Sequence, residues 1–137
     1  MSRLLFPIAA IVVQAVLAFP ALAEDKKFVK PVNQWAGEIE DVAPTIGETR
    51  IFTDSASLAK WWKDSTAPGK VPEANFAQNF VVIVFNRGSS LDIKATMEGS
   101  TMSVFGYGTR DNPPGIRFVV GEFSREGVKK VNDKVLK

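Results

Sequence analysis

The apolar positions of this chain are grouped in short runs, a pattern that predicts β-strands more than helices. The strongest run covers residues 80–85, where six apolar residues follow one another and four of them are β-branched. Such a run is too short for a helix and is typical of a strand that is buried on both faces. We therefore expect residues 80–85 to form the central strand of a sheet.

Three later segments show the alternation or the apolar content of further strands. They cover residues 91–97, 101–105 and 116–123. The small and polar residues at 87–90 and 98–100 are typical of tight turns. We interpret residues 87–90 as a hairpin turn, with an anion-binding loop as the alternative. Consecutive strands joined in this way predict an antiparallel meander.

Two shorter runs that suit strands come earlier in the chain, at residues 34–40 and 49–53. Proline and glycine between them, within residues 42–47, indicate a connecting loop. Residues 24–33 are charged and have no period. They are therefore interpreted as a flexible lead-in or a short edge segment.

One helix is predicted over residues 55–64. Side-chain oxygens at residues 53–55 can cap its first amides, and the segment itself contains neither Gly nor Pro. Leu58 lies three residues before Trp61 and four before Trp62, so these side chains share one wide apolar side. We expect that side to lie across a sheet.

The segment after residue 123 leaves two alternatives. Ser124 could cap a helix that carries several valines. Gly127 and the pair at 132–133 suit turns better than the interior of a helix. We favour short extended pieces around turns at 125–127 and 132–133.

These elements predict an α+β domain, in which an antiparallel sheet of five to six strands carries one amphipathic helix packed on it. We assign this single domain to residues 34–137, after the flexible lead-in at 24–33. Neither internal repeats nor low-complexity tracts interrupt it.

The first 23 residues have the pattern of a cleavable signal peptide. Arg3 precedes an apolar stretch, and Ala-Leu-Ala stands directly before the charged segment that begins at Glu24. We expect cleavage there, export to the periplasm or beyond the cell, and no stable membrane insertion afterwards. The alternative is a retained signal anchor, although the apolar stretch is short for a membrane span and Pro7 and Pro20 interrupt it.

The chain contains no histidine and no cysteine. This composition excludes histidine-based triads, thiol nucleophiles, disulfides and zinc sites built on imidazole or thiolate. Carboxylate chemistry remains, and Glu38 and Glu40 could share one strand face, although alternating surface glutamates are the usual role of such a pair. We predict no enzymatic activity, no cofactor and no metal site.

Charge excludes one class of partner. The chain has 17 Lys and Arg against 15 Asp and Glu, with a net charge of +2 at pH 7. Because these charges are scattered singly, they indicate an ordinary solvated surface and not a nucleic-acid interface.

A protein partner fits the chain better, and the loop over residues 107–115 is the candidate contact surface. The loop is long, is stiffened by two prolines and carries residue types that are enriched in protein interfaces. Its candidate binding residues are Tyr107, Arg110, Asp111, Pro113 and Pro114. The alternative is a solvated connection without a partner.

The doubled tryptophan is a secondary candidate. Neighbouring residues on a helix point about 100° apart, so burial of one of Trp61 and Trp62 tends to leave the other partly exposed. Packing of both in the core is the alternative that we favour.

The order of features over residues 51–120 resembles that of small exported bacterial domains of the PrcB-like, protease-complex-subunit type. The residues that carry the resemblance are Thr53-Asp54-Ser55, Leu58, Trp61-Trp62, Asn75-Phe76, the core strand Val81 to Val84 and Pro113-Pro114-Gly115. The chain departs from that pattern at residues 87–90, where the family tends to have a Gly-Gly-Tyr turn. The resemblance implies a non-catalytic accessory domain that contacts an envelope protease.

The functional hypothesis is therefore an exported, non-catalytic binding domain that contacts another envelope or secreted protein. The alternative is a protein that binds or cleaves glycans through carboxylates and tryptophan.

Overall fold

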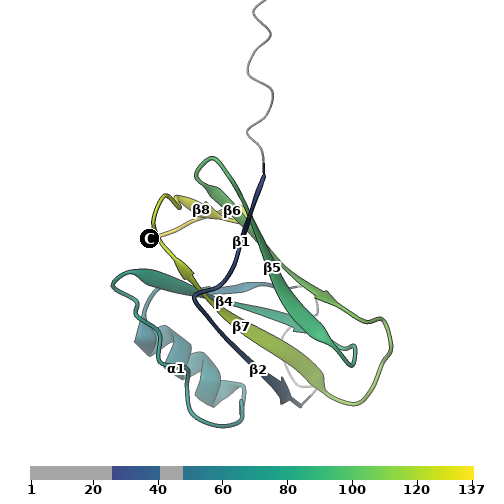
Figure 1. Ribbon diagram of the computed structural model, residues 1–137. Coiled ribbons are helices and arrows are strands. Elements are labelled where there is room, and N and C mark those ends of the chain that lie inside the picture. The colour runs from purple at the N-terminus through teal and green to yellow at the C-terminus, as the bar shows by residue number, and fades with distance from the viewer. Residues whose placement is uncertain (1–25, 41–47) are drawn as a thin grey trace, which may run out of the picture.

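The computed structural model describes residues 26–40 and 48–137 (Figure 1). The predicted signal peptide and the predicted connection at 42–47 lie outside these residues. The elements are β1 (Lys27–Val29), β2 (Asn33–Ile39), β3 (Arg50–Phe52), α1 (Ser55–Asp64), β4 (Asn79–Asn86), β5 (Leu91–Glu98), β6 (Thr101–Gly108), β7 (Ile116–Ser124), β8 (Lys130–Val131) and β9 (Lys134–Val135). Within the described ranges, no helix has the length and apolar content needed to cross a membrane.

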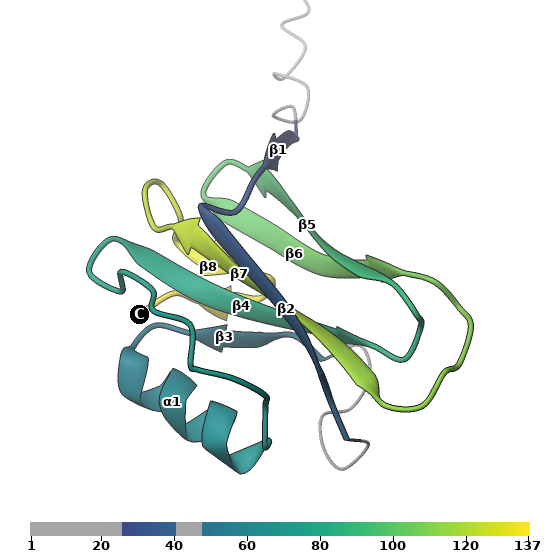
Figure 2. The same cartoon turned by 60° about the horizontal axis from the view of Figure 1, so that its bottom comes forward.

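The strands form two sheets that pack against each other, and α1 lies on the outer side of one of them (Figure 2). One sheet has the strand order β1-β5-β6-β8-β9, and the other has the order β2-β7-β4-β3. All pairings are antiparallel except that of β6 with β8. The predicted α+β class with one helix on a sheet is therefore confirmed.

Strand β4 is apolar throughout because both of its faces are covered. Val81, Ile83 and Phe85 pack into the core beneath α1, whereas Val82 and Val84 pack against the other sheet. The predicted central strand is thus confirmed, and the run of apolar residues is explained by burial between a helix and a second sheet.

The predicted meander is wrong for most of the chain. Of the four strands that the meander joined, only β5 and β6 pair as a hairpin with each other. Strand β4 pairs with β7 and β3, so residues 87–90 connect the two sheets and do not form a hairpin turn. A strand with two apolar faces gains most from a place between two layers, and a simple meander would leave one of those faces in water.

The lead-in contains the short edge strand β1, which pairs with Met97, Thr96 and Ala95 of β5. The tail adopts the extended pieces that the sequence favoured. Gly127 and Asn132 both have positive φ, 72° and 45°, at the two predicted turns. Glycine and asparagine tolerate this left-handed conformation better than other residues.

The helix α1 matches its predicted range, and Asp54 caps it. The Ser57 amide donates to Asp54 Oδ1 over 2.8 Å, and the Ser57 hydroxyl donates to Oδ2 over 2.9 Å. These bonds lower the pKa of the Asp54 carboxyl, mainly through the Ser57 backbone amide. A capping side chain of this kind satisfies an amide that has no partner within the helix.

Replacing the capping residue, Asp54→Ala, is expected to lower the free energy of unfolding, because the first-turn amide loses its acceptor. Chemical denaturation followed by tryptophan fluorescence measures this change. Asp64→Ala, at the last position of the helix, is the matched control. Equal stability of the wild type and Asp54→Ala would contradict the capping role.

Candidate functional site

Two connections between the sheets meet at one end of the molecule, the β4–β5 connection and the start of the β6–β7 loop. The Ser89 amide donates to Asp111 Oδ1 over 2.9 Å, and the Ser90 amide donates to Thr109 Oγ1 over 3.1 Å. Asn86 Nδ2 donates to the Thr109 carbonyl over 3.1 Å. The candidate loop is therefore tied to a second segment at several points.

Asp111, one of the predicted binding residues, has an anchoring role in this arrangement. Hydrogen bonds from the Ser89 hydroxyl and amide, with a further contribution from Thr109, lower the pKa of its carboxyl to about 2. Because the pKa in the folded protein lies below the ordinary value of 3.8, the anchor is complete above that pH. It weakens as the pH falls toward 2.

The variant Asp111→Ala is expected to release the loop, because the Ser89 amide loses its acceptor. We expect faster hydrogen exchange at the Ser89 amide and at the neighbouring loop amides, with the core amides unchanged. Hydrogen exchange followed by NMR measures both. Glu126→Ala, an exposed acid in another turn, is the control, and unchanged exchange at Ser89 in Asp111→Ala would rule out the anchor.

The tied loops enclose a surface hollow of about 520 Å³. Its lining residues are glycines, polar residues and Phe85: Phe85, Asn86, Arg87, Gly88, Gly106, Gly108, Thr109, Arg110, Asp111 and Asn112. A Cβ at Gly108 would meet Asn86 Nδ2, so the close approach of the two strands requires glycine there.

The predicted contact residues differ in how they are presented. Tyr107 is 69% exposed and lies on the outward face of β6, near the exposed Phe105. Arg110 is exposed, and among the described residues its side chain has neither a hydrogen bond nor an ion pair. Pro114 is exposed and Pro113 is half-buried. The structure thus brings one aromatic and one unpaired cation to the same end of the molecule.

The side chain of Arg117 holds the backbone of the β4–β5 connection in place. Its Nη1 donates to the carbonyls of Arg87 and Gly88 over 3.3 and 2.9 Å. Its Nη2 lies 3.7 Å from Glu38 Oε2. Glu38 is therefore engaged with a cation, a structural role that suits one member of the acidic pair seen in the sequence.

The tryptophans contribute to the core, the role that the sequence favoured. Trp62 is 6% exposed and its ring meets that of Phe118 edge-on at 5.4 Å. The half-buried Trp61 contacts Phe52, Phe85 and Phe118 with centroid distances of 6.2, 5.8 and 6.0 Å. Perpendicular or tilted ring pairs of this kind stabilise a core beyond their area of contact.

The sequence reasoning missed Glu122, a buried acid that is 1% exposed. Its Oε1 accepts from the Asn75 amide and from Asn79 Nδ2 over 2.8 and 2.9 Å, and its Oε2 accepts from Asn33 Nδ2 over 2.8 Å. These partners satisfy both oxygens, so the carboxylate is a structural clamp. The signal that could have found it is a single acid within the apolar run at 116–123.

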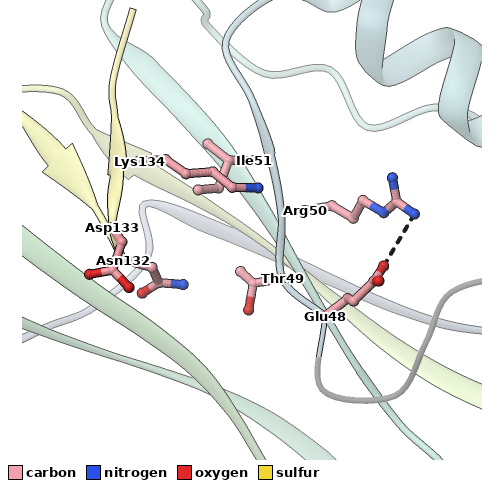
Figure 3. Close-up of a pocket in the computed structure, with 7 residues that line it drawn as sticks. All are labelled: Glu48, Thr49, Arg50, Ile51, Asn132, Asp133 and Lys134. Carbon is pink, nitrogen blue, oxygen red and sulfur yellow. Dashed lines mark hydrogen bonds and ion pairs between the residues drawn. The ribbon is translucent and has the colours of Figure 1, made fainter.

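A second hollow, of about 540 Å³, lies between β3 and the β8–β9 turn (Figure 3). The hollow is lined by charges of both signs. Arg50 Nη2 pairs with Glu48 Oε2 at 3.3 Å on the β3 side, and the β8–β9 turn contributes Asp133 and Lys134. Across the described part of the chain, no three potential ligand side chains gather to hold a metal ion. This hollow therefore offers no concentration of one charge for a ligand.

Comparisons with protein-family models, with curated proteins and with solved structures find no match to this chain.

Proposed function

We propose that this protein is an exported, non-catalytic binding domain that engages another envelope or secreted protein through its Tyr107–Arg110 end. The contact surface comprises the side chains of Tyr107 and Arg110 and the hollow beside them. The resemblance to PrcB-like domains makes an envelope protease the first partner to test.

One observation carries this proposal, the combination of exposed contact groups with a tied backbone. Tyr107 is largely exposed and Arg110 is unpaired within the described residues, yet Asp111 fastens the loop that follows to Ser89. A surface whose backbone is already ordered loses less entropy on binding. Tyrosine and arginine are also the side chains that most often dominate the energy of protein interfaces.

The glycan alternative has less support. It depended on tryptophan as a stacking surface, and Trp62 is buried on the side of α1 that faces the sheet. Trp61 directs its ring into the aromatic cluster. The buried Trp62 therefore offers no open face to a sugar.

A pull-down from an envelope extract tests the proposal, with the wild type compared against the double variant Tyr107→Ala, Arg110→Ala. We expect the wild type to retain a partner that mass spectrometry identifies and the double variant to lose it. The double variant Phe28→Ala, Lys60→Ala removes an exposed aromatic and an exposed cation elsewhere and is expected to behave as the wild type. Equal recovery by all three proteins would refute the contact surface.

A further inference from the structure

Strand β6 has an edge that is covered only at its beginning. The Met102 carbonyl accepts from the Asn132 amide over 2.8 Å. The Val104 amide donates to Asn132 Oδ1 over 2.8 Å, and Asn132 Nδ2 donates to the Val104 carbonyl over 3.2 Å. The side chain of Asn132 therefore extends the short strand β8 by one position.

The same alternation sets the direction of the next backbone groups. In an antiparallel strand, the amide and the carbonyl of one residue point to the same edge, and successive residues alternate between the two edges. The backbone groups of Gly106 and Gly108 therefore point away from β5, as those of Val104 do. Among the described residues, no hydrogen bond reaches the Gly106 or Gly108 backbone on that side. An unpaired strand edge of this kind is a template for another strand.

The opposite edge of this sheet is closed by a different device. Strand β1 ends at Val29, opposite Ala95, so the Ile93 amide has no strand beside it. That amide donates instead to Asp92 Oδ1 over 2.9 Å. A charged side chain that occupies an edge amide protects it from pairing. Among the described residues, no side chain accepts a hydrogen bond from the Gly106 or Gly108 amide in this way.

The surroundings of the open edge specify what could lie there. The hollow next to it is lined by the two glycines and by polar residues of the β4–β5 connection and the β6–β7 loop. Arg110 follows directly and supplies an unpaired positive charge. A carboxylate is the group that complements this charge.

We propose that the β6 edge at Gly106 and Gly108 binds an extended segment of the partner protein as an added β-strand. The segment places a carboxylate beside Arg110. This inference rests on the proposed function and specifies how the partner is held. Backbone hydrogen bonds supply the affinity and the carboxylate supplies the selectivity.

A peptide selection tests the strand addition. Random peptides displayed on phage are selected on the purified protein, and the best binder is synthesised with single N-methyl groups at successive backbone positions. We expect binding to fall roughly tenfold at every second position, because only alternate amides face β6. We also expect the Gly106 or Gly108 amide to exchange roughly tenfold more slowly in the complex.

Protein variants check the side-chain part of the proposal. Arg110→Ala is expected to weaken the selected peptide roughly threefold and to remove the preference for an acid. Lys60→Ala, on α1 and away from β6, is the control and should bind unchanged.

Three results would overturn the strand addition. They are a selection that yields no binding peptide, an equal loss of affinity at every N-methylated position, and a complex in which neither the Gly106 nor the Gly108 amide is protected from exchange. If any of them occurs while the pull-down partner still depends on Tyr107 and Arg110, the proposed function stands and only the added strand falls. Loss of that dependence would instead remove the proposed function itself.

Discussion

The variant Phe118→Ala is expected to lower the free energy of unfolding by about 3–5 kcal/mol. Phe118 is 1% exposed and meets the rings of Trp61 and Trp62 edge-on. Its ring also covers Gly37 of the neighbouring strand. Removal of the ring therefore leaves a cavity between α1 and the sheet, which the surrounding backbone cannot fill. Guanidinium denaturation followed by tryptophan fluorescence measures the loss.

The matched control for this variant is Phe28→Ala, because Phe28 is 83% exposed. We expect that change to stay within about 0.5 kcal/mol of the wild type. A loss below about 1 kcal/mol for Phe118→Ala would contradict the assignment of Phe118 to the centre of the core.

The second large effect is expected at Glu122. Glu122→Leu removes the acceptor of three donors, among them the Asn75 amide, from a buried position. We expect a loss of about 3 kcal/mol in the free energy of unfolding. Glu122→Gln keeps one acceptor and should lose less. The exposed Glu126→Gln is the control, and a Leu variant as stable as the wild type would exclude the clamp.

The pH dependence of stability gives an independent test of the Glu122 clamp. Burial acts to raise the pKa of this carboxyl, but hydrogen bonds from Asn33, Asn79 and the Asn75 amide outweigh it and lower the pKa below 4.5. A folded-state pKa below the unfolded one stabilises the protein above the unfolded value. That contribution is lost as the pH falls through the folded value.

The test is to measure the free energy of unfolding of the wild type and of Glu122→Gln across the acid range. The difference in their free energies of unfolding should be constant above pH 4.5 and should shrink below it. Asp54 and Asp111 titrate in both proteins, so they cancel in the difference. A difference that grows on acidification would contradict the lowered pKa.

Local features of the chain predicted the elements well. Helix α1 has its range because Asp54 caps it and its apolar residues share one side. The turns at Gly127 and Asn132 were expected because these residues tolerate positive φ. In each case the cause lies within a few neighbouring residues, and the sequence displays it directly.

The arrangement of the strands could not be predicted in the same way. Alternation shows which side of a strand is wet, but it does not show which strand lies beside it. The run at β4 suits either a meander or a two-layer packing until α1 and the second sheet are seen on its two faces. The segment of β1 was predicted as either a flexible lead-in or a short edge segment, because Lys27–Val29 is too short to show a period.

The sequence predicted which side chains belong to the candidate site but not the contacts that hold the site together. Tyr107 and Arg110 were chosen for their types, and their exposure agrees with a contact role. The tie between Asp111 and Ser89 joins residues 22 positions apart, and the partners of Glu122 lie 43 to 89 positions away. Such contacts depend on the fold and have no local signature.

Photo-crosslinking within cells tests the central claim most directly. A benzophenone amino acid replaces Tyr107 in one variant and Lys60 in another, and the cells are irradiated before the adducts are identified. We predict one dominant protein adduct from position 107 and none from position 60. No adduct at position 107, or the same adducts at both positions, would contradict a binding surface at this end of the molecule.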